Sequence, residues 1–332
     1  MWDTALALIA LADAGLSEDH PALARAGGWL LGEEVRTRGD WSVKRPGLAP
    51  GGWAFEFANV NSPDVDDTAE VVIALRRLAR TAPLAAAISR AERWVAGMQS
   101  SDGGWGAFDA DNSRALVRAL PFCDFGEVID PPSADVTAHA IEMLALLGRA
   151  QTPAVRRGVQ WLIERQETDG SWFGRWGVNH VYGTGAAVPG LIAAGVAPTD
   201  KCIRRAVRWL ERHQNEDGGW GEDPRSYDDA AWIGRGPSTA SQTAWALLAL
   251  HAAGERSRSR ERGVDWLVSH QRADGTWDEP QYTGTGFPSD YYINYHLYRL
   301  TFPIMALARC LADAGEEGAR ARVSIGAAGR RG

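Results

Sequence analysis

Apolar and charged positions divide the chain into two kinds of helical segment that alternate along it. Six segments are small and mostly apolar, and we expect them to form inner helices; they are residues 3–15, 67–79, 137–149, 185–196, 239–254 and 301–313. Five segments carry more Arg and Glu and are expected to form outer helices; they are residues 20–33, 87–98, 153–165, 199–213 and 256–270. This alternation, with short turns in one direction and long Gly-rich links in the other, is typical of two concentric rings. The pattern predicts an all-α fold, an (α/α)6 toroid, with one outer helix missing, so that the ring has a gap or is completed by sequence not present here.

A short repeat ends four of the outer segments. Its copies are WVAGMQSSDGGW, WLIERQETDGSW, WLERHQNEDGGW and WLVSHQRADGTW, starting at residues 94, 161, 209 and 266. In each copy Gln, an Asp-Gly turn and Trp follow the helix, and the Gly supplies the left-handed conformation that stops a helix. Such recurrence indicates a repeat architecture in which each unit buries its apolar face against the next. We therefore assign the repeat tryptophans to structure: Trp105, Trp172, Trp220 and Trp277.

Charge and cysteine content exclude several classes of protein. The chain has 332 residues, with 35 Lys and Arg against 42 Asp and Glu and a formal charge of −7. Because the Arg residues are scattered, nucleic acid is not an expected partner. The three cysteines lie far apart without a CxxC spacing, which indicates neither a disulfide framework nor a thiolate metal site. We expect a reducing, cytoplasmic location.

The chain is expected to form one toroid domain over residues 1–315, followed by a flexible tail over residues 316–332 that is rich in Gly, Ala and Arg. The N-terminal apolar run lacks the basic region and cleavage site of a signal peptide. No segment approaches the roughly 20 apolar residues of a membrane span.

Three carboxylates crowd the start of one inner segment. Residues 63–71 read PDVDDTAEV, which places Asp64, Asp66 and Asp67 within four consecutive positions. Like charges a few ångströms apart do not all ionise, and burial raises the pKa further, so such a cluster retains a proton. His139, in the sequence DVTAH on the next inner segment, is the best candidate for a cationic hydrogen-bond partner. Together these residues suit the chemistry of a strong acid.

Two simpler interpretations of the same carboxylates stay open. Asp66 and Asp67 suit the first turn of a helix, where free N–H groups and the helix dipole favour negative charge. Clustered Asp residues also hold Mg²⁺ in other proteins. Neither a basic cluster for pyrophosphate nor a second acidic motif accompanies them.

The repeat resembles the QW motif of triterpene cyclases, and PDVDDTAEV resembles the DxDD acid motif of squalene-hopene cyclases, with a match from about Trp2 to Cys310. The resemblance implies a class II terpene cyclase, an isomerase or lyase that needs neither cofactor nor metal. It would protonate a terminal alkene of squalene or a related polyprenoid and steer a cation cascade to hopene or hopanol. The resemblance also implies that Asp66 is the proton donor, with Asp64 and Asp67 as its neighbours and His139 with Asp135 as its supporting network.

Aromatic residues in the long links complete the implied site, because aromatic faces stabilise cations without offering a base. The residues that match substrate-lining aromatics of the family are Trp2, Phe55, Phe122, Phe125, Trp176, Tyr182, Phe287, Tyr295 and Tyr298. Tyr291 stands where Phe is common and is counted with the lining residues. Ser62 stands where Tyr is usual, and both departures bear on which product forms.

The resemblance covers only the C-terminal half of the family's usual length. It implies an N-terminal cyclase domain as a partner, and peripheral association with the cytoplasmic face of a membrane. A second interpretation is a truncated or split-enzyme toroid that binds prenyl chains or a partner domain without catalysis of its own. A third is a prenyltransferase-like toroid with a zinc site of Asp, Cys and His, although Cys123 and Cys202 are not placed with His for it.

Overall fold

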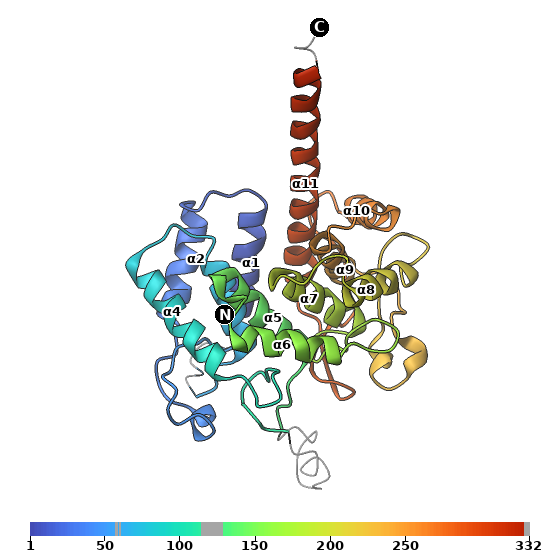
Figure 1. Ribbon diagram of the computed structural model, residues 1–332. Helices are drawn as coiled ribbons and strands as arrows, with labels where there is room; N and C mark the ends of the chain where they lie inside the picture. The colour runs from blue at the N-terminus through green and yellow to red at the C-terminus, as the bar shows by residue number, and fades with distance from the viewer. Residues whose placement is uncertain (57–58, 60, 114–128, 329–332) are drawn as a thin grey trace.

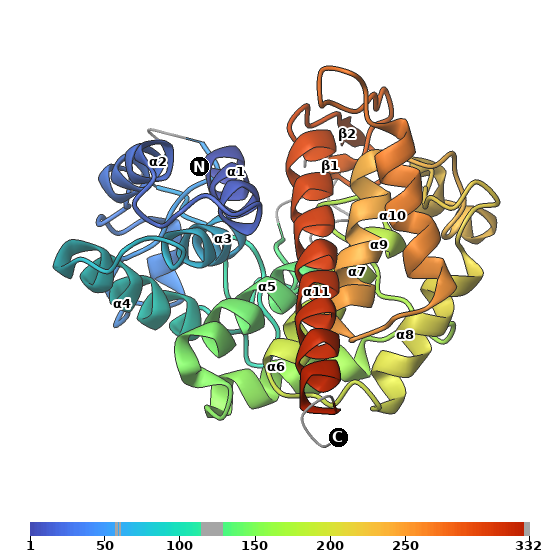
Figure 2. The same cartoon turned by 90° about the horizontal axis from the view of Figure 1, so that it is seen from above.

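Six inner helices form a closed ring. The computed structural model describes residues 1–56, 59, 61–113 and 129–328, with the backbone alone for 314–328. The inner helices are α1 (Trp2–Asp13), α3 (Val65–Leu75), α5 (Ala134–Leu144), α7 (His180–Ala193), α9 (Ala240–Ala252) and α11 (Tyr298–Ala328). Each packs against the next in this order, and α11 packs against α1 (Figures 1 and 2). Every residue of α3 is buried, as the apolar segment requires when neighbours cover all its sides.

Five outer helices cover this ring among the residues that the structure describes. They are α2 (Pro21–Gly32), α4 (Ala82–Gly97), α6 (Pro153–Glu164), α8 (Lys201–Arg212) and α10 (Arg258–His270). Four of them contact both the inner helix before them and the inner helix after them in the chain, and α6 lies against α5. The predicted toroid of six inner and five outer helices is confirmed. Helix α11 continues beyond the ring (Figure 1), and the division into a domain over 1–315 and a tail over 316–332 stays a prediction.

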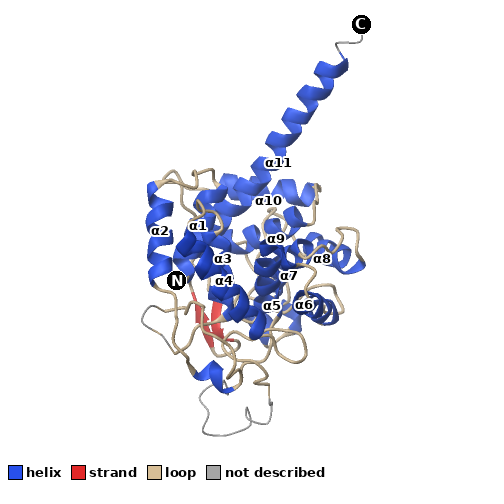
Figure 3. Cartoon of the chain, turned by 60° about the vertical axis from the view of Figure 1, so that its left-hand side comes forward, coloured by secondary structure: helices blue, strands red, loops and turns tan. Residues whose placement is uncertain are grey.

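Short elements lie in the connections between the helices. In the long links that the structure describes they are the 3-10 helices η1 (Asp40–Val43), η5 (Pro224–Tyr227) and η6 (Ala230–Trp232) and the strands β1 (Gly284–Phe287) and β2 (Tyr291–Ile293). The π-helical turn η4 (Ala145–Arg149) follows α5 in the short connection to α6. The strands pair antiparallel, with Gly284 opposite Ile293 and an irregularity between Thr285 and Phe287. This hairpin is the red element of Figure 3 and lies close to the N-terminal end of α1.

The repeat fastens successive outer helices together. In the first copy the Trp105 indole N–H donates to the Val95 carbonyl of its own helix (2.7 Å). The Gln99 amide donates to the Gly103 carbonyl of its own turn (2.7 Å) and to the Ala154 carbonyl at the start of α6 (2.8 Å). The second and third copies repeat these bonds with Gln166 and Gln214.

The Asp of each of these turns adds a further tie to the next outer helix. Asp102 accepts the indole N–H of Trp161 at 2.9 Å, and Asp169 does the same for Trp209. The repeat tryptophans are buried, which agrees with their assignment to structure.

Candidate active site

A cavity of about 370 Å³ opens at the end of the ring where inner helices begin. Its walls come from the first turns of α1, α3, α7 and α11, from the links that follow η1 and the first repeat, and from the β-hairpin. The lining residues are Trp2, Phe55, Glu56, Asp64, Asp66, Asp67, Ala107, Phe108, Trp176, Tyr182, Gly286, Phe287, Ile293, Tyr295 and Tyr298. The structure thus brings the three predicted carboxylates and seven of the predicted aromatic residues into one cavity.

The N-terminus of α3 separates the roles of the three carboxylates. Asp64 is the N-cap, and its Oδ1 accepts the backbone N–H of Asp67 at 2.6 Å. The hydroxyl of Thr68 donates to the Asp64 carbonyl (2.6 Å) and accepts the backbone N–H of Trp53 (2.9 Å), which ties the preceding link to the helix. The capping residue is therefore Asp64, whereas Asp66 and Asp67 lie in the first turn of the helix. Capping does not account for Asp66, whose side chain contacts another helix.

Asp66 is paired with His139 of the next inner helix. Asp66 Oδ1 lies 2.6 Å from His139 Nδ1, and both residues are buried. Burial by itself would lower the pKa of His139, but the charge of Asp66 and the hydrogen bond to it, with the further charges of Glu70 and Glu142, raise that pKa to about 10. His139 is therefore an imidazolium at neutral pH while Asp66 is ionised. A cation fixed against the carboxyl that faces the cavity is the arrangement predicted for a strong acid.

Asp64 and Asp67, the two carboxyls beside Asp66, both have a raised pKa. Burial, with the adjacent charge of Asp67, raises the pKa of Asp64 well above its usual range. Burial raises the pKa of Asp67 to about 7. Burial thus favours the neutral form of both Asp64 and Asp67.

Aromatic rings surround the acid on the cavity side. The indole N–H of Trp2 donates to the hydroxyl of Tyr298 at 2.8 Å, which fixes both rings. Tyr295 stacks on Tyr298 with centroids 4.5 Å apart, and Phe55 meets Tyr295 edge-on at 6.2 Å. Tyr182 meets the ring of His139 edge-on at 6.3 Å.

Asp135 lies behind the cavity wall. Its carboxylate is fully buried and accepts the backbone N–H groups of Arg175 (2.9 Å) and Trp176 (2.8 Å). The Trp176 carbonyl in turn accepts the N–H of Thr285 in β1. Asp135 therefore holds the strand-like link that carries Trp176, and it is not among the residues that line the cavity.

Three other predicted residues are placed differently or not described. Tyr291 is 53% exposed and does not line the cavity. Phe122 and Phe125 lie outside the described residues. In the part of the chain that the structure describes, no group of three or more His, Cys, Asp or Glu side chains is arranged to hold a metal ion, and no helix there is long and apolar enough to cross a bilayer.

Comparison with known proteins decides the family. The model of the squalene-hopene cyclase C-terminal domain matches residues 1–312. The chain belongs to the squalene-hopene cyclase family. It is 57% identical over 313 residues to a squalene-hopene cyclase of Alicyclobacillus acidocaldarius, covering 93% of this chain and 50% of that protein. It is 43% identical to a dammaradiene synthase of Dryopteris crassirhizoma, covering 93% of this chain and 49% of that protein.

Solved structures agree on the fold. An ent-copalyl diphosphate synthase from Streptomyces platensis matches with a TM-score of 0.62 at 23% identity, over 93% of this chain and 50% of that one. The type II terpene cyclase MstE from Scytonema matches with a TM-score of 0.62 at 19% identity, over 94% of this chain and 88% of that one. The chain spans about half the length of the curated relatives named above.

Some lining residues of this squalene-hopene cyclase domain were not predicted from the sequence. Phe108 stands three residues after Trp105 of the first repeat, and its ring meets Trp176 edge-on with centroids 5.9 Å apart. Glu56 and Ile293 flank the predicted Phe55 and the hairpin. The signal for Phe108 was its position directly behind a repeat turn, where the link enters the ring.

Proposed function

We propose that this chain supplies the acid and an aromatic wall of a triterpene cyclase that converts squalene, or a related polyprenoid, to hopene or hopanol. One observation carries the proposal: the carboxyl of Asp66, hydrogen-bonded to His139 on one side, faces an apolar aromatic cavity on the other. Family membership supports the reaction class.

The first step is a proton transfer from Asp66 to a terminal double bond. The O–H bond of the carboxylic acid breaks, a C–H bond forms from the π electron pair of the alkene, and a tertiary carbocation and the Asp66 carboxylate remain. The His139 imidazolium stabilises that carboxylate as it forms, which strengthens the acid at the moment of transfer. Loss of a proton at the end of the cascade gives hopene, and addition of water gives hopanol. A solvent proton then restores the acid.

The aromatic wall would stabilise the cation as it moves away from Asp66. Cation–π contacts contribute about 0.5 to 2 kcal/mol each when desolvated. Trp2, Phe55, Trp176, Tyr295 and Tyr298 present such rings to the cavity. Rings of this kind do not remove a proton from carbon, so they do not end the cascade early.

Activity is expected to require the other half of the length found in the relatives. With one wall of the cavity open, water would reach the cation and quench it. We expect the 332-residue chain alone to turn over squalene weakly or not at all, and to become active when the N-terminal half of a relative is added in trans.

The test is an incubation with squalene, with and without that second half, followed by mass spectrometry for hopene and hopanol. The variant Asp66→Asn removes the acid, and Asp200→Asn is a matched control because Asp200 caps the exposed start of outer helix α8. We expect product only when the second half is present. Asp66→Asn should abolish product formation, and Asp200→Asn should leave it unchanged. Turnover that survives Asp66→Asn would reject the acid assignment.

Binding of squalene with no turnover in any combination would instead favour the non-catalytic toroid. That outcome is separable, because prenyl-chain binding is measured by quenching of tryptophan fluorescence without any product.

A further inference from the structure

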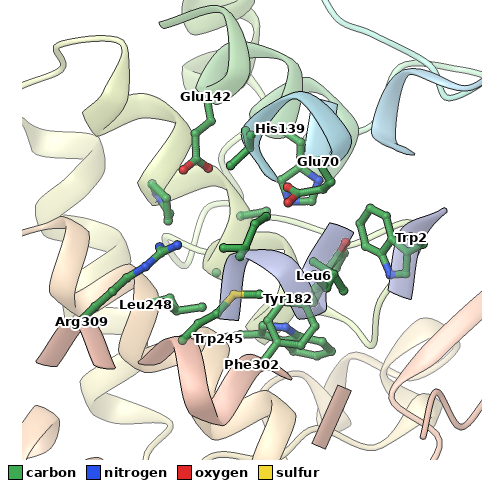
Figure 4. Close-up of a pocket in the computed structure, with 16 residues that line it drawn as sticks. Trp2, Leu6, Glu70, His139, Glu142, Tyr182, Trp245, Leu248, Phe302 and Arg309 are labelled. Atoms are coloured by element: carbon green, nitrogen blue, oxygen red, sulfur yellow. The ribbon is translucent and has the colours of Figure 1, made fainter. Parts of the chain in front are cut away.

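A second, smaller chamber lies on the other side of His139, inside the ring. Its volume is about 70 Å³, enough for a few water molecules but not for a polyprenoid. All six inner helices contribute to its wall. The charged or titratable side chains of Glu70, His139, Glu142 and Arg309 line it (Figure 4), among apolar and aromatic residues.

Glu70 is the most deeply buried of the charged residues in this chamber that the mechanism has not used. It follows Asp66 by four positions on α3, so both side chains lie on one face of the helix. Glu70 is only 8% exposed and lines the chamber beside His139. Burial of a carboxyl has a desolvation cost, so its presence inside the ring needs an explanation.

The acid itself supplies a reason for this group. When Asp66 carries its proton, it no longer balances the charge of His139, and a buried imidazolium would stand without a counter-ion. Such an imidazolium tends to lose its proton, and the carboxylate formed by proton transfer would then lack its cation. A second negative charge close to the imidazole removes this difficulty.

We propose that Glu70 is a positioning residue that acts through His139, its carboxylate keeping the imidazolium charged while Asp66 holds the proton to be delivered. The inference rests on the proposed function of Asp66. It concerns a residue outside the substrate cavity, since Glu70 lines the second chamber and does not line the active-site cavity.

The other charged groups around His139 fit this assignment. From α3 it is faced by Asp66 and Glu70, and from its own helix α5 by Asp135 and Glu142. Helix α7 contributes Tyr182, α11 contributes Arg309, and the wall residues from α1 and α9 carry no charge. Glu142 is half-buried, and Arg309 is bound to Asp13 at 2.7 Å. Glu70 is thus the most deeply buried negative charge available besides the aspartates.

The pH at which this support operates follows from Glu70 itself. Burial raises the pKa of Glu70 to about 7, partly offset by the charge of His139. Below that pH Glu70 is neutral and His139 is protonated by the solvent without help. Above it Glu70 is charged, where the imidazolium needs support. The effect of removing Glu70 must therefore grow with pH.

The direct test uses nuclear magnetic resonance of the full chain with ¹⁵N-labelled histidine. In Asp66→Asn a neutral amide stands in for the protonated acid, so His139 depends on the remaining charges. We expect its pKa in Asp66→Asn to fall by about one pH unit or more when Glu70→Gln is added. Glu142→Gln should give a smaller change and the exposed Glu164→Gln none. An unchanged His139 pKa on adding Glu70→Gln overturns the proposal.

A second measurement needs no substitution at Glu70. In ¹³C-glutamate-labelled Asp66→Asn, the Glu70 carboxyl should ionise while His139 is still an imidazolium. A Glu70 that stays protonated until His139 has lost its proton also overturns the proposal.

Kinetics of this chain together with the N-terminal half of a relative separate electrostatics from packing. Glu70→Gln should reduce kcat by less than about twofold at pH 6 and about tenfold above pH 8, with KM unchanged, while Glu70→Asp recovers most of the alkaline activity. An equal loss at all pH values would show a structural role and refute the proposal. If no cyclisation is found at all, the proposed function fails, yet the resonance titrations still decide whether Glu70 supports His139.

Discussion

The side-chain amide of the repeat Gln offers a stringent test of how the outer ring is held together. Gln166 Nε2 donates to the Gly170 carbonyl of its own turn and to the Cys202 carbonyl in the first turn of α8, both at 2.9 Å. Gln271 occupies the same place in the fourth copy, but it is exposed, and among the described residues its amide donates to its own Gly275 alone, at 3.0 Å. The two positions thus share one motif and differ in the bond to another helix.

The expected destabilisation follows from these bonds. A neutral hydrogen bond contributes about 0.5 to 1.5 kcal/mol net, so removing the two bonds of Gln166 should cost about 1 to 3 kcal/mol. The partly buried Cys202 carbonyl also loses its side-chain partner, which places the cost in the upper part of this range. Gln271→Ala removes one bond in water and should cost about 0.5 kcal/mol or less.

Urea unfolding followed by tryptophan fluorescence measures both variants. Gln166→Ala should lower the midpoint clearly and Gln271→Ala barely, with the same slope as the parent chain. Gln214→Ala serves as a repeat of the first case, because Gln214 makes the same two bonds. Equal losses at positions 166 and 271 would refute the idea that these amides fasten neighbouring helices.

Three further predictions concern the turns, the carboxylates and the aromatic wall. Gly170→Ala should lower the free energy of unfolding more than Gly275→Ala. Both glycines have positive φ (107° and 84°), but an added Cβ at position 170 would lie 2.8 Å from a backbone carbonyl oxygen of α8, whereas at position 275 it would meet nothing within 4 Å. The pKa of Asp67 is raised from 3.8 to about 7, so its contribution to stability is complete below pH 3.8 and is lost as the pH rises towards 7. Asp67→Asn should therefore gain stability relative to the parent between pH 4 and pH 7, by at most about 1.4 kcal/mol for each pH unit. A stability difference that does not change with pH would contradict this. Tyr298→Phe leaves the buried indole N–H of Trp2 without its acceptor and should cost about 1 to 3 kcal/mol, whereas Tyr295→Phe, whose ring is stacked beside it, should cost less in the same unfolding assay.

Much of the fold could be predicted because the same sequence unit recurs several times along the chain. The alternation of apolar and charged segments placed all eleven α-helices of the described residues, and α6 (Pro153–Glu164) agrees with the expected 153–165 to within one residue. Helix starts were less accurate: α7 begins at His180, five residues before the predicted start. Its first turn contains His180 and Tyr182, which are polar enough to resemble a loop yet are buried in the folded chain.

The sequence predicted the parts of the site in which the side chains themselves indicate the chemistry. It did not predict contacts that depend on how the backbone of a connecting segment runs. The pairing of Asp66 with His139 follows from two acid and base signals on adjacent inner helices. The role of Asp135 does not, because its partners are backbone N–H groups of Arg175 and Trp176, which have no sequence signature. The sequence alone did not predict a role for Glu70, although it follows Asp66 by four positions, because a Glu in an apolar segment can serve several structural or chemical roles.

The direction of the inner helices explains why the chemistry collects in one place. Trp2, Asp66, Tyr182 and Tyr298 each lie in the first turn of a different inner helix, and all four line the same cavity, so these helices begin at the same end of the ring. First turns are where free backbone N–H groups favour carboxylates, and where links leave room for aromatic side chains. Deeper positions on the same helices face one another across the ring. A charged residue at such a position, one turn after an acid in the first turn, is buried by the surrounding helices of the ring. Glu70 holds this position relative to Asp66, and it lines the inner chamber together with His139, through which we propose that it acts on the acid.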